Sequence, residues 1–186
     1  MWREIVELSR PKNVVLAAIT VPLGAHLALS GAWSTQALSL VALQTTSAIC
    51  FMAAGNTLND IADVSIDKEA KPNKPIPAQR VSIDQATKIA YSFSLLSATF
   101  MAVGAYLSDE PIPIVLIWSI AAFLMYTYDS GFQTKKMGLL GNVAISLMVG
   151  AVIVFGAAAV SKADTELVLY ASVVAFFANL AREIIK

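Results

Sequence analysis

The chain has 186 residues, of which 57% are hydrophobic and only 14% are charged, and its formal net charge is zero. Because a soluble domain is usually about a quarter charged, this composition argues against one and indicates a membrane protein. The balanced charge gives no reason to expect a nucleic-acid partner, and the single cysteine, Cys50, excludes an internal disulfide.

Six stretches are apolar over roughly the 20 residues that a membrane span requires. The predicted spans are residues 14–30, 37–58, 83–107, 112–128, 139–160 and 167–185. Before the first, residues 1–13 predict a short amphipathic helix at the membrane surface, with Trp2 as interfacial anchor. Ser82 and Gln85 have the spacing of a capping box at the start of the third span. The sequence therefore predicts an all-α, polytopic transmembrane helix bundle.

The basic residues predict the orientation of this bundle. With these spans, twelve of the thirteen Lys and Arg residues fall on one side, and only Lys162 falls on the other. The positive-inside rule then places the N-terminus and the loops after the second and fourth spans in the cytoplasm. We expect a multi-pass protein of the cell membrane.

A cluster of polar side chains follows the second span. If its helix continues through residue 67, at 100° per residue, five oxygen-bearing side chains share one arc about 100° wide. They are Asn56, Asn59, Asp60, Asp63 and Asp67. Clustered carboxylates repel one another unless a cation lies between them, and oxygen ligands without His or Cys suit Mg²⁺. The arc therefore predicts a magnesium site.

Basic side chains next to this arc are suited to bind phosphate. In the loop after the second span they are Lys71, Lys74 and Arg80. An alternative interpretation is a solvated loop of mixed charge that only anchors the topology.

A second basic stretch, residues 126–142, lies on the same predicted side of the membrane. Its Lys135 and Lys136 are candidates for the same phosphate, and Tyr126 or Tyr128 for the wall of the cavity. The alternative here is positive-inside anchoring with an aromatic belt.

Residues 59–67, NDIADVSID, match the pattern NDxxDxxxD, and NKPIPAQRVS follows at 73–82. With SRPKN at 9–13 and the Tyr/Lys stretch at 126–142, the sequence resembles the UbiA superfamily of intramembrane prenyltransferases over most of its length. Among its members, the archaeal enzymes that prenylate geranylgeranylglyceryl phosphate are the most similar.

The resemblance implies a bundle, typically of nine spans, around a central cavity. Such proteins transfer a prenyl group from an allylic diphosphate, here geranylgeranyl diphosphate, to a lipophilic acceptor with the help of Mg²⁺. It implies that Asn59, Asp63 and Asp67 ligate metal and that Asn56 and Asp60 support them or add ligands. The residues implied to hold the diphosphate are Arg10, Lys74, Arg80, Lys135 and Lys136. Those implied to be catalytic are Asp63, Asp67, Tyr126 and Lys135.

The sequence departs from the family pattern at its C-terminal end. The family has a second aspartate-rich motif after the sixth span and three further spans, whereas NLAREIIK at 179–186 resembles only the lead-in to that motif. We therefore interpret residues 1–186 as a single transmembrane prenyltransferase domain with six of nine spans, truncated before that motif. Asn179, Arg182 and Glu183 are expected to border the second metal site. The sequence does not predict whether residues 1–186 are active without that second motif.

Two alternatives remain for the function. The acceptor is either geranylgeranylglyceryl phosphate or a quinone precursor such as 4-hydroxybenzoate. A protein of another class, a non-catalytic lipid-binding or transport protein, would carry ionisable residues within its spans. The acids here follow the second span, which favours phosphate chemistry at the membrane surface. The oligomeric state is not encoded in any pattern of the sequence.

Overall fold

A computed structural model describes residues 1–29, 33–129, 132–160 and 165–185. Over these residues the chain forms eight α-helices and one short 3₁₀ helix. The helices are α1 (Trp2–Ser9), α2 (Pro11–Ala28), α3 (Thr35–Ala62), α4 (Val64–Ala70), α5 (Ile83–Leu107), α6 (Pro111–Asp129), η1 (Thr134–Lys136), α7 (Leu139–Ala158) and α8 (Thr165–Ile185). The predicted all-α architecture is confirmed.

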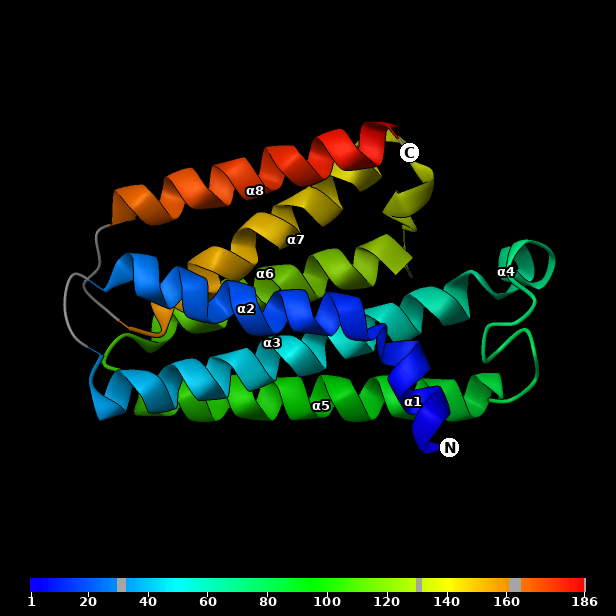
Figure 1. Cartoon of the computed structure of the whole chain (residues 1–186), viewed down its shortest axis with the longest axis horizontal. Coiled ribbons are helices and arrows are strands. Elements are labelled where there is room, and N and C mark those ends of the chain that lie inside the picture. Colours follow the sequence, from blue (N-terminus) through cyan, green and yellow to red (C-terminus); the bar gives the residue numbers. More distant parts are fainter. Residues whose placement is uncertain (30–32, 130–131, 161–164, 186) are drawn as a thin grey trace.

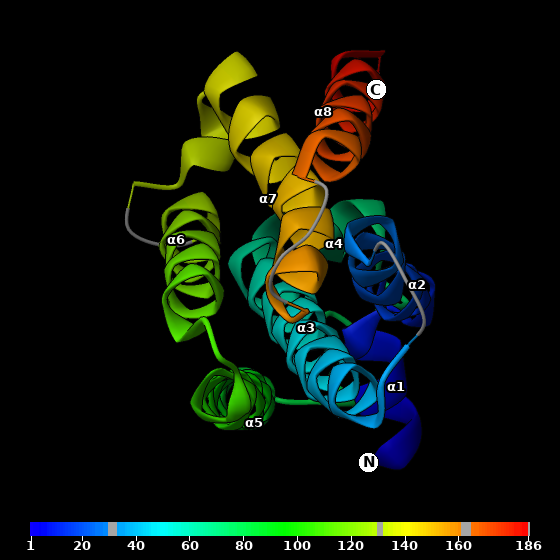
Figure 2. The ribbon, with the colours of Figure 1, turned by 90° about the vertical axis from the view of Figure 1, so that its left-hand side faces the viewer.

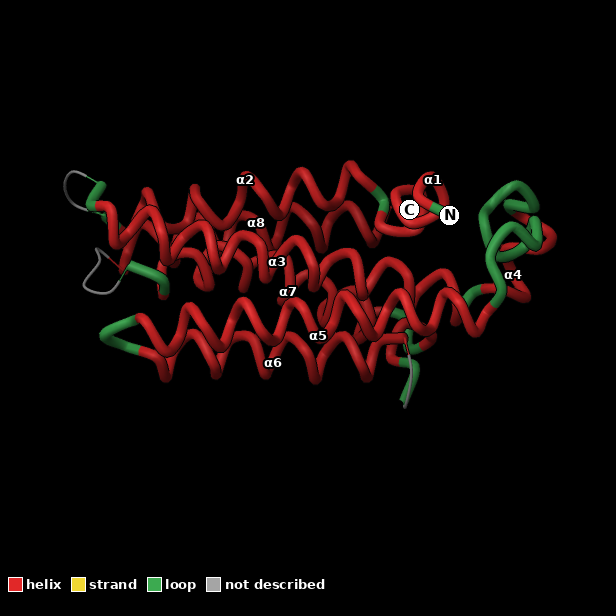
Figure 3. Tube along the Cα trace, turned by 90° about the horizontal axis from the view of Figure 1, so that it is seen from below, coloured by secondary structure: helices red, strands yellow, loops and turns green. Residues whose placement is uncertain are grey.

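The six long helices run alternately in opposite directions along one bundle (Figure 1). Residues 63–82, which include α4, join α3 to α5 at one end of the bundle, and α1 and the end of α8 lie at the same end (Figures 1 and 3). Seen along the bundle, α3 and α7 lie toward the middle, with α2, α5, α6 and α8 around them (Figure 2). This topology brings segments far apart in the sequence to one end of the bundle.

Five of the long helices are long and apolar enough to cross a membrane, namely α3, α5, α6, α7 and α8. The predicted third span coincides with α5, and the predicted capping box forms between Ser82 and Gln85. The first predicted span corresponds to the 18-residue α2, so the number of six spans stays a prediction. Lys162 lies outside the described residues, as do residues 30, 130, 131 and 186 of the predicted segments.

The helices α2 and α7 approach each other closely because glycine occupies both contact points. A Cβ atom on Gly24 would lie 2.0 Å from the carbonyl oxygen of Ile153, and one on Gly156 would lie 2.0 Å from that of Val21. Real Cβ atoms do not approach backbone so closely. Small residues that permit such contacts are typical of helix packing in membranes, where van der Waals contact replaces the hydrophobic effect.

The helix of the predicted second span, α3, does not continue through residue 67, so the prediction of one continuous helix was wrong. The helix α3 ends at Ala62, Asp63 has φ −95° and ψ 8°, and α4 starts at Val64. Aspartate disfavours helix interiors because its side chain competes for backbone groups, and the β-branched Val64 follows it. The chain therefore bends in the middle of the acidic motif.

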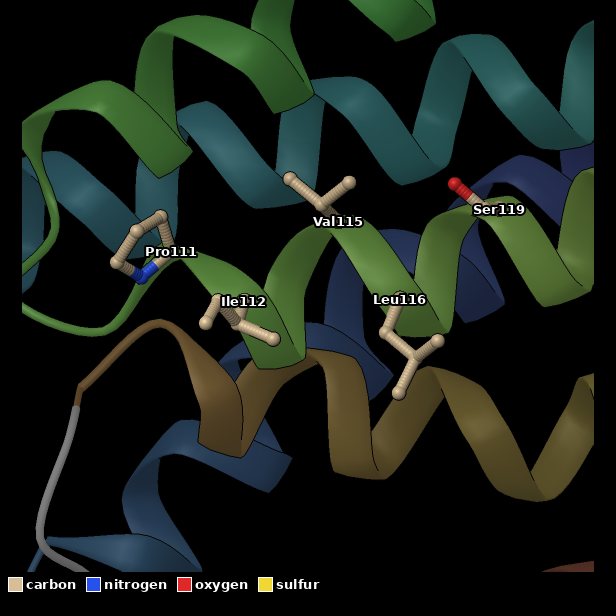
Figure 4. A pocket seen from close by; sticks show the side chains of 5 residues that line it. All are labelled: Pro111, Ile112, Val115, Leu116 and Ser119. Atoms are coloured by element: carbon tan, nitrogen blue, oxygen red, sulfur yellow. The ribbon is translucent and has the colours of Figure 1, made fainter.

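An open apolar groove of about 340 Å³ lies along the first turns of α6, at the end of the bundle opposite α4 (Figures 3 and 4). Its lining residues are Pro111, Ile112, Val115, Leu116 and Ser119. Because this lining has no charged side chain, the groove is not suited to phosphate or metal.

Candidate active site at the α4 end of the bundle

The acidic motif lies at the end of the bundle that carries α1 and α4 (Figure 1). Three cations from separate segments contact it: Arg10 from the junction of α1 and α2, Lys74 from loop 71–82, and Lys135 from η1. These contacts join residues up to 72 positions apart in the sequence. The site therefore depends on the packing of the whole bundle.

Asp60 is the point at which two of the cations meet. Its Oδ1 accepts hydrogen bonds from the Arg10 guanidinium and, at 2.8 Å, from Lys74 Nζ. The same Nζ donates to Asp67 Oδ2 at 2.6 Å. Lys74 thus connects the last turn of α3 to α4 across the bend at Asp63. Asp60 and Asp67 are both buried.

The environment of Lys74 favours its charged form. Burial lowers the pKa of this ammonium group, but the hydrogen bonds that it donates to Asp60 and Asp67 outweigh that effect, so the pKa is raised above its ordinary value. Lys74 is therefore protonated throughout the physiological range, ready to compensate phosphate charge.

Lys135 organises the other side of the cluster. Its Nζ donates to Asp63 Oδ1 at 2.7 Å and lies 3.3 Å from Asp129 Oδ1. Asn59 Nδ2 also donates to Asp129 Oδ1, at 3.0 Å, while Asn59 Oδ1 accepts from Arg10 at 2.8 Å. Asn59 thus connects the Arg10 side of the cluster to the Lys135 side.

Asn56 fixes the polypeptide next to Arg10. Its Oδ1 accepts from Asn13 Nδ2 at 3.0 Å, and its Nδ2 donates to the Ser9 carbonyl at 2.7 Å. The Asn56 side chain therefore contacts both the end of α1, at Ser9, and the first turn of α2, at Asn13. This arrangement holds the chain at Arg10, which has a left-handed φ of 52°.

The donor set is suited to Mg²⁺ in combination with phosphate. Three cations (Arg10, Lys74 and Lys135) face four carboxylates (Asp60, Asp63, Asp67 and Asp129). These seven side chains together carry a formal net charge of −1. Within the described part of the chain, no three acidic, His or Cys side chains lie close enough to hold a metal by themselves. Because Mg²⁺ is often bound by one or two carboxylates plus water and substrate phosphate, the residues fit such an ion.

Three of the predicted site residues lie away from this network. Arg80 donates to Glu7 of α1, Tyr126 is 62% exposed on α6, and Lys136 is exposed in η1. Of the residues predicted near a second metal site, Asn179 donates to Ser146 Oγ at 3.0 Å and Arg182 pairs with Glu183 at 2.6 Å. Their roles stay predictions.

Two residues of the network were not singled out from the sequence. Asp129 is 5% exposed and contacts both Asn59 and Lys135. It is the first ionisable residue after the predicted fourth span, a position that could have drawn attention to it. Asn13 is the last residue of the SRPKN segment, directly before the predicted first span. Nothing in the neighbouring sequence indicates its contact with Asn56.

The molecule is thus an all-α bundle with five helices able to cross a membrane, and three cations from separate segments pair with an acidic motif at one end of it. The model of the UbiA prenyltransferase family matches residues 8–185, and the chain belongs to this family.

Curated relatives support the assignment. The chain is 32% identical over 185 residues to digeranylgeranylglyceryl phosphate synthase of Pyrococcus abyssi, covering 99% of this chain and 62% of the relative. It is 34% identical over 184 residues to the synthase of Thermococcus gammatolerans, again covering 99% and 62%. The chain thus spans about 62% of the length of these relatives.

Solved structures share the fold. One of digeranylgeranylglyceryl phosphate synthase has a TM-score of 0.77 at 23% identity, over 98% of this chain and 60% of that one. A UbiA homologue from Archaeoglobus fulgidus, solved with DMAPP and Mg²⁺, has a TM-score of 0.66 at 19% identity, over 96% and 61%. The UbiA-like transmembrane fold is therefore confirmed.

Proposed function

We propose that this protein transfers a prenyl group from an allylic prenyl diphosphate to a lipophilic acceptor, with Mg²⁺ as cofactor. The observation that carries the proposal is the convergence of Arg10 and Lys74 on Asp60 at the end of an apolar bundle. An amphipathic substrate with a charged head and a hydrocarbon tail fits this arrangement, because burial of the tail contributes about 0.8 kcal/mol per CH₂.

The proposed metal ligands are Asn59, Asp63 and Asp67, with Asp60 and Asn56 as supporting groups. When bound, Mg²⁺ would neutralise charge on the diphosphate and make it a better leaving group. The donors present, carboxylate and amide oxygens, match this ion, and the Mg²⁺ named with the Archaeoglobus fulgidus homologue supports the choice.

The three cations of the cluster have the complementary role. Arg10, Lys74 and Lys135 exchange their carboxylate partners for diphosphate oxygens and so stabilise the negative charge that grows on the leaving group. The C1–O bond of the prenyl diphosphate breaks, and positive charge develops on C1. The apolar helices exclude water, which would otherwise capture that carbon. An acceptor hydroxyl oxygen then bonds to C1, and its proton passes to the diphosphate, which leaves with the electron pair of the broken C1–O bond.

The proposed acceptor is geranylgeranylglyceryl phosphate, and the proposed donor is geranylgeranyl diphosphate. The names of the curated relatives support this choice, since they are digeranylgeranylglyceryl phosphate synthases. We also propose that the α4 end of the bundle faces the cytoplasm of the cell. The charge bias of the sequence and the position of α1, α4 and the motif at the same end support that orientation.

A transfer assay tests this function. The full-length protein in lipid vesicles is given labelled geranylgeranyl diphosphate, Mg²⁺ and either geranylgeranylglyceryl phosphate or 4-hydroxybenzoate. We expect label only in the glyceryl phosphate product. Label in the aromatic acceptor would identify a quinone-precursor enzyme instead. Diphosphate binding without transfer to any acceptor would contradict an enzymatic role and favour lipid binding.

A further inference from the structure

Arg80 joins two segments that each carry a cation of the site. Its guanidinium makes a bidentate pair with Glu7 of α1, at 2.9 Å from NH1 to Oε2 and 3.0 Å from NH2 to Oε1. The same NH2 donates to the Asn73 carbonyl at 2.8 Å. Asn73 directly precedes Lys74. One side chain therefore connects the helix before Arg10 to the backbone beside Lys74.

Loop 71–82 transmits this connection because it is compact. The Pro75 carbonyl accepts hydrogen bonds from the backbone amides of Arg80 and Val81, at 2.9 and 3.2 Å. Pro75 itself is fully buried, and Ile76 and Val81 are 6% and 2% exposed. Arg80 and Lys74 thus belong to one folded unit, in which a shift of one moves the other.

A hydrophobic contact brings the same two segments together. Leu8 of α1 is fully buried against Ile76, Val81 and Ala86. Ser9 follows, and its carbonyl accepts from Asn56 in α3. The end of α1 is therefore fixed on one side by the loop and on the other by the motif helix.

Together these contacts form a closed ring. It runs from Glu7 to Arg80, through the loop to Lys74, then to Asp60, and back through Arg10 to α1. We propose that Glu7 and Arg80 are positioning residues that set the place where Arg10 and Lys74 meet, and so the geometry of the diphosphate site. This proposal rests on the proposed function.

Stability is not the main contribution expected of this pair. The side chains of Arg80 and Glu7 are 35% and 40% exposed, and exposed ion pairs stabilise a fold little. A displacement of about 1 Å in a binding group, in contrast, can lower activity up to about a hundredfold. The effect of breaking the pair should therefore appear in substrate binding rather than in unfolding.

The test uses Glu7→Gln, Arg80→Gln and the double variant Glu7→Gln/Arg80→Gln in the full-length protein. The matched control is Asp84→Asn, which breaks the exposed Lys88–Asp84 pair away from the site. We expect each single variant to raise KM for prenyl diphosphate about tenfold, with kcat changed less and thermal stability like that of the control. The double variant should raise KM no more than Arg80→Gln alone, because both substitutions break the same connection.

Hydrogen exchange of residues 71–82 provides a readout that needs no substrate. The amides of Arg80 and Val81 should exchange faster in both single variants, and in the double variant no faster than in Arg80→Gln. Wild-type KM and exchange rates in the single variants would overturn the proposal, as would a double variant in which the two single increases in KM multiply, because the two residues would then act independently. If the wild type transfers nothing, the proposed function fails, while the exchange result still decides whether the ring holds the loop.

Discussion

Replacing Lys135 by methionine would leave a buried carboxylate without its cation. Lys135 is 12% exposed and serves both Asp63 and Asp129, and Asp129 is only 5% exposed. After the substitution, the hydrogen bond from Asn59 Nδ2 at 3.0 Å is the one that Asp129 keeps among the described residues. Asp63, at 27% exposed, can regain water. The destabilisation should therefore come mainly from Asp129.

The size of the loss follows from these distances. At an effective dielectric of about 20, the attraction across 2.7 to 3.3 Å is about 5–6 kcal/mol per pair before desolvation. Desolvation of the ammonium group offsets much of it. Removing one partner of a buried pair usually costs 3–5 kcal/mol, and the partial exposure of Asp63 places this case near the lower limit, at about 3 kcal/mol.

Denaturant unfolding in mixed micelles measures this loss. Lys135→Met should lower the free energy of unfolding by about 3 kcal/mol, and adding Asp129→Asn should restore at least half, because the unpaired charge is then absent. Lys136→Met is the control, since Lys136 is exposed and forms no ion pair with any described side chain. The reasoning is refuted if Lys135→Met behaves like the control, or if Asp129→Asn increases the loss.

Two further predictions concern packing and pH. Gly156→Ala should destabilise the bundle by about 1–3 kcal/mol, because its Cβ would lie 2.0 Å from the Val21 carbonyl oxygen. Gly55→Ala meets only the flexible Met125 side chain and should be nearly neutral; equal thermal shifts for the two would contradict the close approach of α2 and α7. The raised pKa of Lys74 means that its stabilisation is fully present below the unfolded value of 10.5 and is lost only as pH rises through the higher folded value. The stability difference between wild type and Lys74→Met should therefore be the same at pH 7 and 9 and shrink above about pH 10.5; a decline between pH 7 and 9 would refute it.

The sequence was informative wherever the physical cause is local. Apolar stretches predicted the long helices, and the capping spacing at Ser82 placed the start of α5 at the correct residue. Helical spacing placed Asn56, Asn59 and Asp60 together on the last turns of α3, whereas Asp67 lies in α4 beyond the bend. Each of these signals depends on residues within a few turns of one another, so no knowledge of tertiary contacts is needed.

Tertiary contacts decided the rest. Arg80 has the chemistry of a phosphate ligand, but its guanidinium pairs with Glu7, 73 residues away. Asp129 joins the site only because α6 ends beside Asn59, 70 residues earlier. The bend at Asp63 arises where α3 gives way to α4. The periodic pattern of side chains predicts a helix that continues through this bend, because Asp63 and Val64 have helix propensities that are only slightly unfavourable.

The most direct test of the account is the Mg²⁺-dependent binding of a non-hydrolysable prenyl diphosphate analogue, measured by calorimetry on the full-length protein in lipid. Asp63→Asn and Asp67→Asn are compared with Asp84→Asn, whose parent side chain is exposed at the start of α5. We predict that chelation abolishes binding, that each motif variant weakens it by about tenfold or more, and that the control binds like wild type. Binding that is indifferent to chelation and to both motif substitutions would contradict the assignment of this cluster as the metal–diphosphate site.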